Sequence, residues 1–121
     1  MKKQQQMVLE FHRTFDLNIG PYPEFPDDKE CALRAKLIQE EFYELMVALA
    51  DSTLSDVAKE AADLIYVVLA MAVSFGFDME SVFNEVHRSN MTKIGGKIVD
   101  GKLIKPSTYQ KADIKSVLKP W

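Results

Sequence analysis

Apolar residues recur at helical spacing in four segments of the chain, which predicts four main helices. In the first segment, for example, Met7, Val8 and Phe11 fall on one face. In the second, Leu37 and Leu45 follow the same period. The predicted helices are Gln4 to Phe15, Asp27 to about Asp51, Ser55 or Asp56 to Phe75, and Met79 to about Lys93.

Breaks between these segments are marked by residues that stop or start helices. Three prolines and a glycine within Asn18 to Pro26 predict an ordered surface loop after the first helix. Gly76 is a plausible stop for the third helix, and Asp78 is a good N-cap for the fourth. Because the connections are short, the second and third helices are expected to be antiparallel neighbours.

The pattern changes beyond Lys93. Asp100-Gly101 lies between two short apolar runs, at 97–99 and 102–104, and this arrangement predicts a β-hairpin. The rest of the tail, to Trp121, is basic and partly apolar, and we expect it to lie across the domain or a partner subunit. The predicted fold is therefore an all-α antiparallel four-helix bundle with a short C-terminal β-hairpin, in a single domain of residues 1–121.

Size and charge narrow the function. A chain of 121 residues and 13.8 kDa can bury one core, but a large active site would need a second subunit, so we expect a homodimer or homotetramer. A net charge of −3 gives no general attraction to nucleic acid. The most apolar run, Ala61 to Phe75, is short for a membrane span, Cys31 has no disulfide partner, and no secretory signal is evident. We expect a cytoplasmic protein with no membrane partner.

Four carboxylates stand where apolar residues are expected. At about 100° per residue, Glu41 falls in the apolar stripe of the second helix, and Glu44, at the edge of that stripe, projects from the same face. Asp63 is the only charged residue between Ala61 and Phe75, and Glu60 precedes it by one turn. A buried, unpaired carboxylate is strongly unfavourable, so a positive partner is expected there.

Antiparallel packing of the second and third helices brings the two acidic pairs together. Four converging carboxylates form an oxygen-only site, which favours Mg²⁺ first and Mn²⁺ second. Acids at this spacing are also common on solvated faces or beside a lysine, as Lys36 stands to Glu40. A di-iron site is excluded because it requires Glu-x-x-His, which neither His12 nor His87 completes.

These residues also carry a resemblance to a known family. The segment EEFYE at 40–44, fifteen residues and then EAAD at 60–63 resemble the EExxE…ExxD pattern of the MazG-type all-alpha NTP pyrophosphatase superfamily. The resemblance extends from the Phe11-His12 segment through HRSNMTK at 87–93 to the GKLIKP tail at 101–106.

The resemblance implies hydrolysis of a nucleoside triphosphate between its α and β phosphates, giving a monophosphate and pyrophosphate. The four acids would then be the Mg²⁺ ligands, and Glu40 would orient or deprotonate the attacking water. Asn90 and Lys93 would contact the phosphates, while Tyr109 is a candidate for stacking on the base. Arg88 and Lys36 complete the candidate substrate-binding residues, although a basic residue such as Arg88 also complements a helix C-terminus.

The substrate stays open at this point. Phosphoribosyl-ATP pyrophosphatases of histidine synthesis share the acidic pattern and are similarly short. The Asn90-x-x-Lys93 motif and the proline-rich loop look less like those enzymes, so we favour house-cleaning of dUTP or damaged nucleotides. The competing class is a non-enzymatic helical interaction module, whose acids would bind a basic partner.

Overall fold

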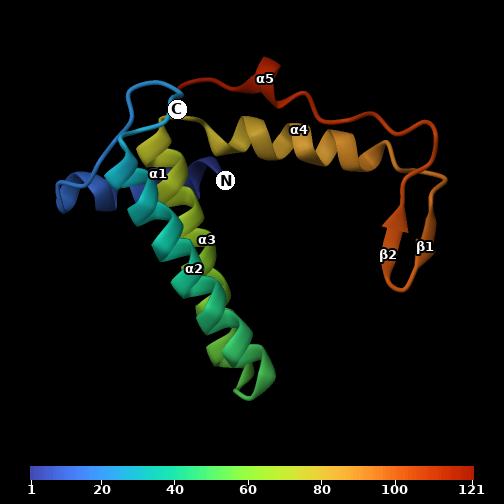
Figure 1. Ribbon diagram of the computed structural model, residues 1–121, viewed down its shortest axis with the longest axis horizontal. Helices are drawn as coiled ribbons and strands as arrows, with labels where there is room; N and C mark the ends of the chain where they lie inside the picture. Colours follow the sequence, from blue (N-terminus) through green and yellow to red (C-terminus); the bar gives the residue numbers. More distant parts are fainter.

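The computed structural model describes residues 1–121 and is mostly helical (Figure 1). The predicted all-α class and the C-terminal hairpin are confirmed. In chain order the elements are α1 (Lys2–Thr14), α2 (Asp28–Ala50), α3 (Leu54–Phe75), α4 (Met79–Met91), β1 (Lys97–Val99), β2 (Lys102–Ile104) and a short α5 (Ile114–Val117).

Side-chain caps fix the starts of α2 and α3, while α1 begins at Lys2, two residues before the predicted Gln4, without a side-chain cap. The side chain of Asp27 accepts a hydrogen bond from the Glu30 amide and caps α2, as predicted. Helix α3 begins at Leu54, before the predicted Ser55 or Asp56, because the Thr53 hydroxyl accepts from the Asp56 amide. The predicted antiparallel pair of long helices is present and forms the α2–α3 hairpin, which projects from the rest of the molecule (Figure 1).

A small core joins α1 to the base of this hairpin. Five buried apolar side chains, all from α1 and the second half of α3, pack together there: Val8, Leu9, Leu69, Ala70 and Val73. Gln5, also fully buried, donates from Nε2 to the carbonyl oxygen of Phe77 and accepts from the Met79 amide. The turn between α3 and α4 is therefore fixed to α1 by both ends of one amide side chain.

The proline-rich loop docks on the C-terminus of α3. The amides of Gly20 and Glu24 donate to the carbonyl oxygens of Val73 and Phe75, which lack their regular i+4 amide partners at the end of the helix. Gly76 ends the helix at φ 77°, and a β-carbon at this residue would lie 2.3 Å from the Tyr22 carbonyl oxygen. Only glycine fits both the left-handed backbone and this close approach.

A chain of polar contacts ties the same loop to α1, α2 and α3. Buried His12 lies with Nδ1 2.8 Å from the Asn18 carbonyl oxygen, and Asn18 Nδ2 donates to Ser74 Oγ. Ser74 Oγ and Arg34 Nε in turn donate to the same carboxylate oxygen of Glu30, at 2.7 and 2.6 Å. The contacts of His12 thus link α1 to the proline-rich loop and stabilise the fold.

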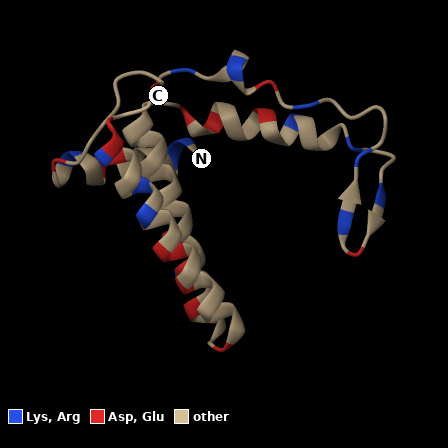
Figure 2. Cartoon of the chain, in the orientation of Figure 1, with Lys and Arg blue, Asp and Glu red and all other residues tan.

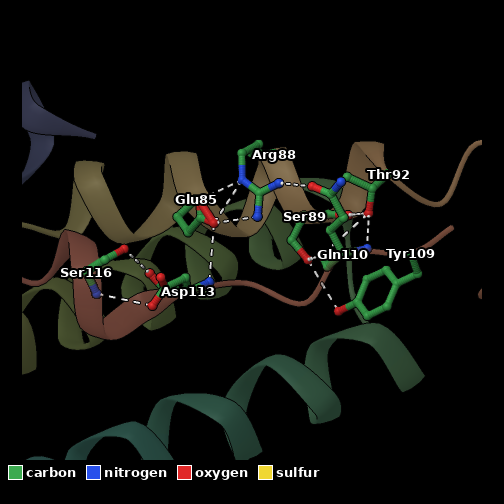
Figure 3. Close-up of polar contacts among 8 residues, drawn as sticks. All are labelled: Glu85, Arg88, Ser89, Thr92, Tyr109, Gln110, Asp113 and Ser116. Carbon is green, nitrogen blue, oxygen red and sulfur yellow. Dashed lines mark hydrogen bonds and ion pairs between the residues drawn. The ribbon is translucent and has the colours of Figure 1, made fainter.

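Helix α4 leaves the α2–α3 hairpin at a bend of 115° and runs outward, with the C-terminal tail beside it (Figure 1). We call this part of the molecule, residues 79–121, the arm. The tail is held by side chains of α4, shown in Figure 3. Ser89 Oγ donates to the Gln110 carbonyl oxygen at 2.7 Å, the Gln110 amide donates to Thr92 Oγ1, and the Asp113 amide donates to Glu85. Strands β1 and β2 form the antiparallel hairpin at the far end of this arm, pairing Lys97 with Ile104.

The single chain exposes much apolar surface. Its accessible area is 8670 Å², whereas a compact monomer of 13.8 kDa would expose about 6,600 Å². Large apolar side chains are exposed on both projecting parts: Phe42, Tyr43, Val47 and Leu54 on the hairpin, and Phe83, Val86 and Met91 on α4. No single helix combines the length and apolarity of a membrane span; only α3 and α4 taken together across their bend would do so by composition.

Replacing Gly76 by Ala should destabilise the fold by about 2–5 kcal/mol, the sum of left-handed strain and backbone crowding. Gly101→Ala is the matched control, because Gly101 has a nearly equal φ of 76° but nothing within 4 Å of the added carbon. Urea unfolding followed by circular dichroism measures both. Equal losses in the two variants would show that the docked loop does not constrain Gly76.

Candidate metal centre and its surroundings

The four predicted acids converge midway along the α2–α3 hairpin. Each offers one carboxylate oxygen, and these four oxygens lie within 4.8 Å of one another; the residues are Glu41, Glu44, Glu60 and Asp63. Antiparallel packing of the two helices places the i,i+3 pair of one opposite the i,i+3 pair of the other. The acids of the hairpin are visible as red segments in Figure 2, whereas lysines mark the β-hairpin at the far end of the arm.

Two oxygens of this acidic cluster have no partner within the chain. Glu41 Oε2 and Glu60 Oε2 are both buried, and neither accepts a hydrogen bond. A buried carboxylate oxygen without a donor is unfavourable, and a hard cation satisfies it. The donor set therefore fits a divalent ion coordinated by oxygen.

Lys59 is the one cation of the chain that contacts this cluster. Its Nζ lies 2.7 Å from Asp63 Oδ2 and 3.6 Å from Glu60 Oε1. The Asp63 side chain is 36% exposed, so it is less buried than its position in an apolar helix predicts. The expected positive partner is thus present even without a metal, and the i,i+4 spacing of Lys59 and Asp63 is the signal that would have identified it.

Crowding of charge perturbs the titration of Glu60. Desolvation is the largest cause that raises its pKa; the ammonium of Lys59 opposes it, and a hydrogen bond to Glu44 and repulsion from Glu44 and Asp63 raise it further. The same contacts raise the pKa of Lys59, chiefly through its hydrogen bond to Asp63. The carboxylates are therefore held together against their mutual repulsion.

The remaining predicted site residues divide into two groups. Glu40 and Lys36 are exposed on α2, next to Glu41 and one turn before Glu40 respectively. Arg88 and Asn90 lie on α4, Lys93 just beyond it, and Tyr109 in the tail, all on the arm that diverges from the hairpin (Figure 1). Within one chain, the second group is not brought to the acidic cluster.

Arg88 already has partners on the arm. Its guanidinium pairs with Glu85, with Nη2 to Oε1 at 2.7 Å, and Nη1 donates to Gln110 Oε1 (Figure 3). A role in holding the tail thus accounts for Arg88 better than the predicted contact with substrate does.

Tyr109 lies in a positively charged environment. Lys93 and Lys105 place their ammonium groups 5.6 and 4.8 Å from the centre of its ring. The Ser89 hydroxyl, with Oγ 3.3 Å from the Tyr109 oxygen, lowers the pKa of Tyr109, and the nearby lysines lower it further. Neither Lys93 nor Lys105 has an acidic partner in an ion pair, so this end of the arm is a positively charged surface available to an anion.

Space beside the acidic cluster is itself acidic. A shallow depression runs from Glu44 and Glu60 toward the tip of the hairpin, where Asp51 and Asp56 line it, and no lysine or arginine is among its lining residues. A triphosphate placed there would meet no cationic side chain of the same chain, and every charged residue that lines the depression is acidic. Phosphate oxygens would need cations from bound metal and from outside this surface.

Lowering the pH should stabilise the metal-free fold, because Glu60 then binds a proton. Since its folded-state pKa is raised, the folded state holds the proton more tightly than the unfolded state, so stability is lost as pH rises through that pKa. In EDTA at pH 7, Glu60→Gln should therefore unfold at a higher temperature than wild type, and the difference should shrink toward pH 4.5. Glu10→Gln, an exposed change on α1, is the control. A pH-independent difference would contradict the assignment to Glu60.

Comparison with known proteins points to the same part of the chain as the acidic cluster. No curated protein matches the chain. One family profile, described as phosphoribosyl-ATP pyrophosphohydrolase, matches residues 8–90, which include the α2–α3 hairpin with all four acids and most of α4. The resemblance to the MazG-type all-alpha superfamily, of which this family is a member, is confirmed. On a match covering more than half its length, the chain belongs to the phosphoribosyl-ATP pyrophosphohydrolase family.

Proposed function

We propose that this pyrophosphohydrolase is Mg²⁺-dependent and cleaves the α–β phosphoanhydride of a nucleotide triphosphate, with Glu41, Glu44, Glu60 and Asp63 as the metal ligands. The observation that carries the proposal is the convergence of four carboxylate oxygens within 4.8 Å. Two buried oxygens without hydrogen-bond donors support a cation at the same place. Mn²⁺ is the expected substitute, because it accepts the same oxygen ligands.

The reaction joins a water oxygen to the α phosphorus and breaks the bond from that phosphorus to the bridging oxygen, so that pyrophosphate leaves. Bound Mg²⁺ would lower the pKa of the attacking water and offset charge on the phosphates. Glu40 stands next to Glu41 with an exposed carboxylate, so it can accept the proton of that water. At the base of the α2–α3 hairpin, the hydrogen bond from Ser74 to Glu30 joins α3 to α2 and helps to keep the two pairs of acids in register.

Phosphate donors are proposed to come from a second copy of the chain. The depression beside the four acids has no basic residue, whereas the arm presents Asn90, Lys93 and Tyr109 far from its own hairpin. The accessible area exceeds that of a compact monomer by about 2,000 Å², which is enough for a standard interface. A homodimer, or a dimer of dimers, that seats the arm of one copy on the hairpin of another would join opposite charges and cover exposed apolar residues.

Two substrates are in contention. The family description favours phosphoribosyl-ATP, which shifts the balance from the dUTP or damaged nucleotide favoured by the Asn90-x-x-Lys93 motif. Both share the triphosphate, so the acidic cluster does not discriminate between them. Discrimination has to come from contacts to the base and sugar, for which Tyr109 is the candidate on the arm.

An interaction module without activity is the less supported reading. It requires the carboxylates to be exposed for a basic partner, and Glu44 is exposed. The buried, unpartnered oxygens of Glu41 and Glu60, however, are out of reach of a large partner. Membership of a pyrophosphohydrolase family also favours the enzyme.

Pyrophosphate release from phosphoribosyl-ATP, dUTP and the common nucleoside triphosphates, with and without Mg²⁺, tests the reaction. Glu41→Gln and Asp63→Asn should each lower kcat/KM by at least about 100-fold, because each removes a charged ligand from the metal. Asp100→Asn, at the tip of the β-hairpin, should retain wild-type activity. Full activity in either cluster variant would refute the ligand assignment, and a panel with no turnover would refute the enzyme.

Mixing two inactive variants tests completion of the site by a second copy. If Lys93 acts on the partner's acids, Glu41→Gln and Lys93→Met should each be inactive alone. Co-refolded in equal amounts, they should recover roughly a quarter of wild-type activity, because half of the dimers are mixed and each has one intact site. Activity that stays at the level of the single variants would place Lys93 and Glu41 in the same chain's site. Light scattering that gives a monomer mass would reject the assembly.

A further inference from the structure

Lys59 differs from the other lysines of the chain because its ammonium group contacts the acidic cluster. Its ammonium lies at hydrogen-bond distance, 2.7 Å, from Asp63 and 3.6 Å from Glu60, two of the four acids. Both contacts come from one side chain that is 65% exposed and carried on a flexible stem. The remaining two acids, Glu41 and Glu44, reach no cation of the chain.

We propose that Lys59 is a built-in counter-cation of the metal centre, which holds Asp63 and Glu60 in place before a divalent ion arrives and competes with that ion for them. The inference rests on the proposed function in one respect, namely that the four acids bind a divalent ion. It goes further by assigning a role to a residue outside the acidic motif.

Electrostatics give this residue two opposite effects. Without metal, one ammonium offsets part of the repulsion among four clustered carboxylates, so it keeps the hairpin from splaying at this point. With metal, the same ammonium would lie at hydrogen-bond range from a carboxylate oxygen of one of the four ligand residues, and two cations so close oppose one another. Lys59 has to withdraw as the ion enters, and its high exposure makes that withdrawal easy.

An ordinary surface pair would behave differently. An i,i+4 lysine and aspartate on a helix contribute a small stabilisation that does not depend on whether another site is filled. A counter-cation, in contrast, stabilises the metal-free protein and weakens metal binding. The two accounts therefore differ in the sign of the effect on metal affinity.

The test uses the full chain, free of nucleotide, and measures Mn²⁺ binding by calorimetry. Lys59→Met removes the ammonium and keeps the stem, whereas Lys29→Met makes the same charge change at an exposed α2 lysine that has no ion pair. Lys59→Met should bind Mn²⁺ about 3- to 10-fold more tightly than Lys29→Met. In EDTA its melting temperature should be about 1–4 °C lower, and saturating Mn²⁺ should remove that deficit.

Equal or weaker Mn²⁺ binding by Lys59→Met, relative to Lys29→Met, would overturn the counter-cation role and leave Lys59 as a helix surface pair. Lys59→Gln, measured in parallel, guards against an effect of the new thioether. Absence of Mn²⁺ binding in the wild type and in every variant would overturn the proposed function as well. Binding that is equal in all of them overturns this inference alone.

Discussion

Electrostatic repulsion among four carboxylates is the interaction that the rest of the structure has to offset. Glu41 and Glu44 on α2 face Glu60 and Asp63 on α3, and one carboxylate oxygen from each lies within 4.8 Å of the others. Such an arrangement is unfavourable in a stable fold unless positive charge is supplied, because like charges repel. Desolvation, and then the neighbouring Glu44 and Asp63, raise the pKa of Glu60. The α2–α3 hairpin must therefore be held together by other contacts, and a cation bound among the four acids would relieve their repulsion.

Polar contacts that hold the helices together lie at the base of the α2–α3 hairpin, away from the acids. The proline-rich loop donates two amides to the end of α3, and the contacts from His12 through Asn18 and Ser74 to Glu30 join α1, α2 and α3. These interactions fix the crossing of α2 and α3, and hence the facing of the acidic pairs some turns away. The geometry of the acidic cluster thus depends in part on polar contacts made some distance from the acids.

Sequence periodicity was enough to predict the four main helices, the hairpin at Asp100-Gly101 and the acidic cluster, because each follows from local spacing. The start of α3 was misplaced, since Thr53, Ser55 and Asp56 are all good caps and only the folded chain selects one. Asp63 was predicted to be buried because α3 is apolar on most sides, whereas the single chain leaves part of that surface open and pairs Asp63 with Lys59. The divergence of α4 depends on tertiary contacts at Gln5 and Phe77, which no local pattern encodes.

Within one chain, the acidic cluster and the lysines around Tyr109 lie on different parts of the fold, and this separation bears on function. The hairpin carries the negative charge and the arm carries Lys93 and Lys105 around Tyr109, with apolar residues exposed on both. Joining them across two copies would place phosphate donors opposite metal ligands. The metal centre nevertheless remains the central claim. Anomalous scattering from crystals soaked in Mn²⁺ tests it most directly: the account predicts density among the four carboxylates, and Mn²⁺ bound only elsewhere, or not at all, would contradict it.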